Sequence, residues 1–270
     1  MPVLLLKLLL TPLLITLASL AGRRWGPAVG GWLVGLPLTS APVAVILTAE
    51  HGADFAATAA LGILGGVASQ AVFAVAYARS AHRGGVVGAS AAAIAGFAAC
   101  TAVLSRAPLP LAGMLGVSLG ALLISLPLFA RGSGGERRTA STAMRLPAWD
   151  LPARIVVATG FVALVTGIAG AAGPRLAGLI TPFPIYAAVL TVFAHRALGP
   201  RAAVATLRGL VLGLFAFVSF FAVLAATLPR LGWVAFLAAA AATGLVQAAS
   251  LHGVNPPPVA PAGARVASRP

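Results

Sequence analysis

The feature that most limits the fold of this chain is the scarcity of charge along its apolar stretches. Of its 270 residues, 60% are hydrophobic and 8% are charged, too few charges to cover a soluble domain of this size. Several apolar stretches exceed the roughly 18 residues that a helix needs to cross a bilayer. Such a span must satisfy its backbone hydrogen bonds internally, and no strand-like alternation of barrel length is present. We therefore expect an all-α, polytopic bundle of membrane helices.

The apolar stretches predict nine spans, at 3–20, 28–48, 55–78, 86–104, 110–130, 152–172, 175–195, 202–228 and 232–251. The first resembles a signal peptide, but Arg23 and Arg24 follow its apolar core instead of preceding it, so we expect a retained span. With nine spans, most of the 18 Lys and Arg residues fall on one side. The positive-inside tendency then predicts a cytoplasmic C-terminus and an outside N-terminus.

A second constraint is an internal repeat, because residues 26–104 align without a gap with residues 173–251. The most informative matches are Gly and Pro, which mark unusual backbone geometry. They pair Gly26 with Gly173, Pro27 with Pro174, Gly31 with Gly178, Pro37 with Pro184, Gly52 with Gly199, Gly62 with Gly209, Gly66 with Gly213 and Gly85 with Gly232. The offset covers five spans, an odd number, which predicts two inverted-topology repeats.

The charges of two equivalent loops agree with this inversion. Loop 49–54 carries Glu50, His51 and Asp54, whereas its counterpart 196–201 carries two arginines. The predicted organisation is a first repeat of four spans, a linker helix with a basic cytoplasmic loop, a second repeat of four spans and a disordered tail. Their bounds are 1–108, 109–151, 152–252 and 253–270.

Prolines near the middle of the second and seventh predicted spans suggest where a solute could bind. Pro removes a backbone donor and frees carbonyls within the membrane. Broken helices at matching positions of inverted halves are a sequence signature of a transport site. The expected lining residues are Pro37, Thr39, Ser40, Thr181, Pro184 and Tyr186. The alternative is a pair of proline kinks whose freed groups are satisfied by neighbouring helices.

Three further polar residues are candidates. Gln70 and Arg208 lie inside predicted spans, where polar groups are often functional, so we include both in the substrate site. Alternatively, Gln70 bonds a neighbouring helix and Arg208 extends to the cytoplasmic surface. Glu50 is a candidate coupling carboxylate at the outer mouth. The alternative for its loop is a solvated turn in which Asp54 caps the following helix.

Other features have structural interpretations. The pairs Gly31/Gly35, Gly62/Gly66 and Gly209/Gly213 have the small-xxx-small spacing that lets helices approach closely. Cys100 is the only cysteine, so no intrachain disulfide forms and no thiolate zinc site is expected. We find no catalytic motif, metal constellation or cofactor signature. The arginines are scattered over short loops, which argues against nucleic-acid binding.

Residues 173–228 begin Gly-Pro-Arg-Leu-Ala-Gly-Leu-Ile-Thr-Pro-Phe-Pro-Ile-Tyr and end in a long Gly- and Phe-rich predicted helix. This pattern resembles the GlpM family of small bacterial inner-membrane proteins. Residues 26–78 match less well, with Leu36-Pro37-Leu38-Thr39-Ser40 in place of the Phe-Pro block. The resemblance implies two fused copies and an inner-membrane address, and it transfers no functional residues.

Together these patterns favour a secondary transporter or exporter of a small solute that works by alternating access, without enzymatic activity or a cofactor. The partners expected are the lipid bilayer, an unidentified solute, and either a second copy or another membrane protein. The scarcity of deep charge favours a neutral, apolar or lipid-like solute. The alternative is a non-transporting scaffold or accessory subunit in envelope or polysaccharide assembly.

Overall fold

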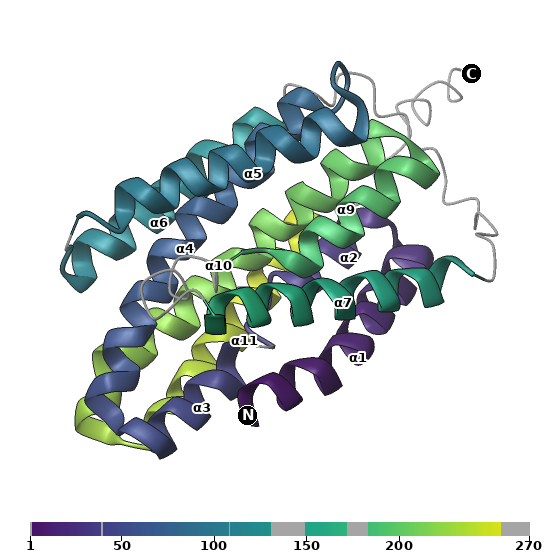
Figure 1. Cartoon of the computed structure of the whole chain (residues 1–270). Coiled ribbons are helices and arrows are strands. Elements are labelled where there is room, and N and C mark those ends of the chain that lie inside the picture. The colour runs from purple at the N-terminus through teal and green to yellow at the C-terminus, as the bar shows by residue number, and fades with distance from the viewer. Residues whose placement is uncertain (1, 39, 108, 131–148, 172–182, 255–270) are drawn as a thin grey trace, which may run out of the picture.

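The structure is a computed structural model that describes residues 2–38, 40–107, 109–130, 149–171 and 183–254. Within these ranges every regular element is an α-helix, which confirms the all-α part of the expected fold class (Figure 1). The nine spans and the inverted repeats stay predictions. The helices are α1 (Pro2–Trp25), α2 (Pro27–Val34), α3 (Ser40–His51), α4 (Ala53–Ser80), α5 (Gly85–Leu104), α6 (Leu111–Ala130), α7 (Asp150–Ala171), α9 (Ile185–Leu198), α10 (Pro200–Leu231) and α11 (Val234–Val254). The predicted cytoplasmic loop and tail, and the start of the seventh predicted span, lie largely or wholly outside the described residues.

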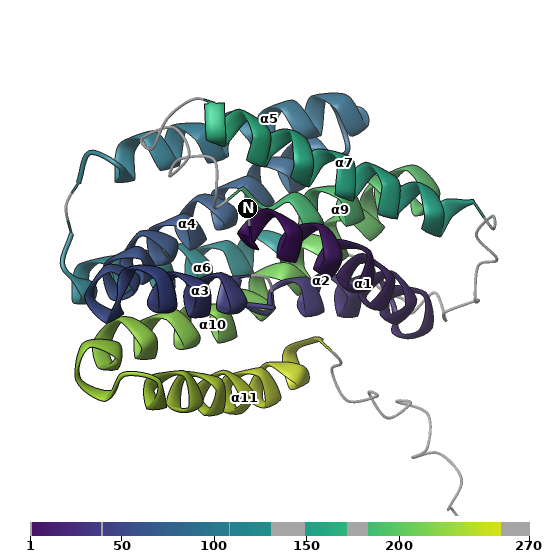
Figure 2. The same cartoon turned by 60° about the horizontal axis from the view of Figure 1, so that its bottom comes forward.

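Five of the described helices are long and apolar enough to cross a membrane, namely α4, α5, α6, α10 and α11. Two of them form the centre of the bundle. In α4 and α10, 56% and 61% of the most apolar window is buried, against 17–22% in the other three. α4 packs against α5 and α6, and α10 packs against α2, α9 and α11, with α11 along its outer side (Figure 2).

The central helices α4 and α10 run in opposite directions. Phe183, just before α9, packs edge-on against Phe73, and His195 near the end of α9 packs against Tyr77 near the end of α4. α9 therefore runs in the same direction as α4, and the chain reverses at Gly199 into α10 (Figure 1). α1 and α7 are also antiparallel, because Arg23 at the end of α1 contacts Asp150 at the start of α7.

Glycines with positive φ set the starts of four helices at matching positions. Gly52 precedes α4 with φ 86° and ψ 170°, and Gly199 precedes α10 with φ 85° and ψ 178°. Gly85, the first residue of α5, has a φ of 58°, and Gly232, between α10 and α11, has a φ of 53°. L-residues rarely adopt such angles, so these turns require glycine. The alternative interpretation of Asp54 as a cap is wrong, since Gly52 is the N-cap and Asp54 lies in the first turn.

The predicted interruption near Pro37 is present. α2 ends at Val34 and α3 begins at Ser40, with a turn between them in which the Leu36 N–H donates to the carbonyl of Leu33 at 3.2 Å. The carbonyl of Pro37 accepts a hydrogen bond from the Ala41 N–H at 2.8 Å. We expected proline to leave carbonyls free here. For Pro37 that expectation is wrong, because the carbonyl that its missing N–H would leave free, that of Leu33, accepts the hydrogen bond from Leu36.

The small-residue motifs of α2 and α10 pack against each other. A Cβ added at Gly31 would overlap the carbonyl oxygen of Thr206, and one added at Gly35 would lie 2.6 Å from the Cα of Gly213. A Cβ at Gly209 would overlap the carbonyl oxygen of Ala28 in the same way. Glycine therefore allows the two backbones to touch, as the spacing predicted.

Candidate functional site

The two proline-containing regions meet at a small cavity between α1, α2 and α9. Tyr186, in the first turn of α9, lines it together with residues of α1 and of the α2–α3 connection. The other lining residues are Leu14, Leu17, Ala18, Leu33, Val34, Leu36 and Leu38. The cavity has a volume of about 60 Å³, and its walls are apolar apart from the tyrosine. This space is well below the roughly 300–1,000 Å³ of most small-molecule sites.

Of the predicted lining residues that the structure describes, Tyr186 lines this cavity, whereas Pro37, Ser40 and Pro184 do not. Pro37 and Pro184 are buried, and Ser40, the first residue of α3, is half-buried. The Tyr186 hydroxyl is 3.0 Å from the Thr11 hydroxyl on α1, so it links α9 to the N-terminal helix. Thr39 and Thr181 lie outside the described residues.

The other three predicted site residues do not line this cavity. Gln70 on α4 and Arg208 on α10 are half-buried, and both have interaction partners within the protein. Glu50 lies at the end of α3 with its side chain 46% exposed, and one carboxylate oxygen is 4.0 Å from Nε2 of His51. Among the described residues, the structure therefore does not bring these three side chains to the proline breaks.

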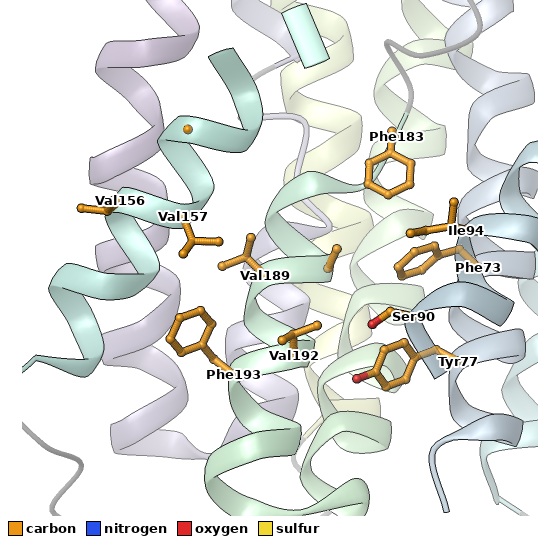
Figure 3. A pocket seen from close by; sticks show the side chains of 12 residues that line it. Phe73, Tyr77, Ser90, Ile94, Val156, Val157, Phe183, Val189, Val192 and Phe193 are labelled. Atoms are coloured by element: carbon orange, nitrogen blue, oxygen red, sulfur yellow. The ribbon is translucent and has the colours of Figure 1, made fainter. Parts of the chain in front are cut away.

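A much larger cavity lies between α9 and the helices α4, α5 and α7. Its volume is about 370 Å³, within the range of small-molecule sites. Its walls come from α4, α5, α7, α9 and Phe183, two residues before α9 (Figure 3). The lining residues are Phe73, Tyr77, Ser90, Ile94, Val156, Val157, Gly160, Phe183, Ala188, Val189, Val192 and Phe193. Ile94, Val156 and Val157 are 48%, 70% and 49% exposed, so the cavity opens sideways between α5 and α7.

One end of the large cavity is polar. The Tyr77 hydroxyl on α4 lies 3.0 Å from Nδ1 of His195 on α9, and both side chains are buried. Ser90 of α5 lies beside Tyr77 and faces the same space (Figure 3). This hydrogen bond ties the two helices together and places hydroxyl groups at the boundary of an otherwise apolar space.

Sequence reasoning missed this polar group, although the repeat contains a signal for it. With the offset of the repeat, Tyr77 aligns with Leu224, Ser90 with Leu237 and His195 with Thr48. The cavity is thus polar where the two copies differ, and the differences themselves could have singled out these residues.

The same end of the bundle is strongly basic. Arg79, Arg83, Arg196 and Arg201 are all exposed and lie within two turns of Tyr77 or His195 along the chain. On the neighbouring helix pair, Asp150 is 4% exposed. It accepts hydrogen bonds from Arg23 at 2.7 Å and from Nε of Arg154 at 3.0 Å. The guanidinium of Arg154 also lies 5.1 Å from the ring centre of Phe193, which lines the large cavity.

Within the part of the chain that the structure describes, no group of three or more His, Cys, Asp or Glu residues could hold a metal ion. Comparison with models of known protein families, with curated proteins and with solved structures finds no match. The resemblance of residues 173–228 to the GlpM family therefore stays a prediction. By their length and composition, five of the described helices indicate a helical membrane protein.

Proposed function

We propose that this protein is a secondary transporter of the inner membrane, built from two inverted repeats that move a small solute by alternating access. The observation that carries the proposal is the opposite direction of equivalent helices. α4 and α10 occupy matching positions in the repeat and run antiparallel at the centre of the bundle. Extended toward the N-terminus, the same offset pairs the start of α1 with the start of α7, and these two helices too are antiparallel.

The backbone angles at equivalent turns support the same proposal. Gly52 and Gly199 agree within a few degrees in φ, and so do Gly85 and Gly232. Two copies of one helical unit that insert in opposite directions would have this relation. The full set of nine spans, with the N-terminus outside and the C-terminus in the cytoplasm, belongs to this proposal. The basic end near His195 then faces the cytoplasm.

α9 is the element whose movement would connect the two cavities. Tyr186 lines the small cavity, and four other residues of α9 line the large one, so α9 contributes to the walls of both. The glycine contact between α2 and α10 limits the motion, because these two helices belong to different sequence halves and touch through their backbones. We therefore expect α2 and α10 to move as one body. The rocking of one complete half against the other would break this contact.

Water access to the proline break tests the transport proposal. Leu38 lies in the α2–α3 connection, lines the small cavity and is 43% exposed. In a Cys100→Ala background, we expect Leu38→Cys to react with a membrane-impermeant thiol reagent added from either side of the membrane. The reason is that alternating access exposes this cysteine to water in both states, and in water its thiol can ionise to the reactive thiolate.

Leu13→Cys is the matched control, since Leu13 on α1 is 53% exposed and is absent from both cavities. It faces lipid in the proposed arrangement and should stay unreactive. Reaction of Leu38→Cys from one side only, or from neither, would contradict transport through this site. That outcome would favour the alternative of a static scaffold or accessory subunit. Pro37→Ala, which removes the constraint at the break, should abolish the two-sided reaction while insertion stays normal.

A further inference from the structure

The large cavity between α4, α5, α7 and α9 opens toward the side of the bundle, where acyl chains would surround a membrane protein. Its mouth is formed by exposed aliphatic side chains on α5 and α7, and its floor by Phe73 and Phe183. Such a space holds water poorly, because the apolar walls provide few hydrogen-bond partners. An apolar chain that enters sideways is therefore its natural occupant.

Apolar contact alone does not select a ligand inside a bilayer, since lipid tails are as apolar as the cavity walls. Selection must come from the shape of the cavity and from its polar end. At that end the Tyr77–His195 pair and Ser90 mark the boundary between apolar and polar surroundings. Immediately beyond it, Arg79, Arg83 and Arg196 are exposed, and no Asp or Glu is present in residues 77–90 or 190–201 to offset them.

We propose that this cavity binds one acyl chain of an anionic lipid, with the phosphate of the headgroup held by the arginines beyond Tyr77 and His195. This proposal rests on the proposed transport function, because it assigns the substrate class of the same α9-lined pathway. Arginine suits this role, since its guanidinium binds phosphate oxygens through paired hydrogen bonds. The lipid would lie with its tail between α5 and α7 and its headgroup on the basic side.

The geometry favours this occupant over a polar solute. A sugar, an amino acid or a metal ion would lose its hydration in a space whose walls are phenyl rings and aliphatic side chains. An acyl chain has no such hydration to lose when it enters this space. A zwitterionic lipid fits the apolar part equally well but gains less from the arginines, so the charge of the headgroup decides the preference.

Filling the cavity tests the proposal. Gly160 of α7 lines it, and among the described residues a Cβ at this position would meet nothing within 4 Å. Gly160→Leu should therefore fold normally and occupy the space of the acyl chain. The matched control is Gly244→Leu on α11, where an added Cβ also meets open space but the residue is absent from the cavity.

The probe is phosphatidylglycerol in nanodiscs that hold equal amounts of phosphatidylcholine, and the readout is native mass spectrometry of the released protein. We expect one phosphatidylglycerol to be retained by the wild type and by Gly244→Leu. Gly160→Leu should reduce its retention at least about tenfold. Arg79→Gln combined with Arg196→Gln should abolish the preference for phosphatidylglycerol over phosphatidylcholine, whereas Arg106→Gln, in the loop between α5 and α6, should leave it unchanged.

Equal retention by Gly160→Leu and the wild type would overturn the proposal, as would retention that ignores the headgroup in the wild type. Binding is measured here without transport, so the two proposals fail separately. If the wild type shows no lipid preference while Leu38→Cys is labelled from both sides, only the proposed substrate class is contradicted. If the wild type retains the lipid but Leu38→Cys is labelled from one side only, the transport proposal is contradicted and the lipid-binding proposal stands.

Discussion

At the scale of single residues, the close contact between α2 and α10 depends on the absence of side chains. Gly31 on α2 and Gly35, its C-cap, lie against Thr206, Leu210 and Gly213 on α10, backbone to backbone. Without a hydrophobic driving force between helices in lipid, this close van der Waals contact is a principal source of association. The contact also joins the two sequence halves, so these glycines affect the whole molecule.

Gly31→Ala should therefore destabilise the protein, because the new methyl group would overlap the Thr206 carbonyl and force the helices apart. We expect a loss of about 1–3 kcal/mol in the free energy of unfolding. Gly116→Ala on α6 is the matched control, since Gly116 is exposed and, among the described residues, an added Cβ meets nothing within 4 Å. The control should be neutral or slightly stabilising. Equal stabilities in a denaturant titration of the purified proteins would contradict this account.

At the scale of elements, the ion-paired junction of α1 and α7 holds two helices that are far apart in sequence. Asp150 and Arg154 are 4% and 7% exposed, so their charges depend on each other and on Arg23. Removing one member of a buried pair leaves an uncompensated charge, which costs more than removing both.

Asp150→Leu should lower the free energy of unfolding by about 3–5 kcal/mol, because it leaves Arg154 buried beside a second cation. The double variant Asp150→Leu with Arg154→Met should recover a large part of that loss. Thermal unfolding of the single and double variants in one detergent measures both effects. A double variant no more stable than Asp150→Leu would show that the buried charge is not the cause.

The elements themselves could largely be predicted from the sequence, because their signals are local. Apolar runs of membrane length predicted α4, α5, α6, α10 and α11, and Pro37 predicted the break between α2 and α3. The pairs at the candidate sites could not be predicted in this way. Tyr77 and His195 are 118 positions apart, and Arg23 and Asp150 are 127 apart. Such contacts depend on how whole helices pack, which no spacing in the sequence specifies.

At the scale of the whole molecule, the account depends on two copies of one unit that lie in opposite directions in the bilayer. The proposed opposite insertion would account for the antiparallel α4 and α10, for the nearly equal φ of their starting glycines, and for the different charges of equivalent loops.

The most direct test of the central claim is the sidedness of two equivalent loops. Glu50 and Arg201, both exposed, flank the glycines that begin α4 and α10. In a Cys100→Ala background, single cysteines at these positions would be labelled in intact cells with a membrane-impermeant maleimide. Opposed repeats predict that Glu50→Cys reacts from outside and that Arg201→Cys reacts only after the membrane is permeabilised. Reaction of both from the same side would contradict the inverted arrangement and the transport proposal built on it.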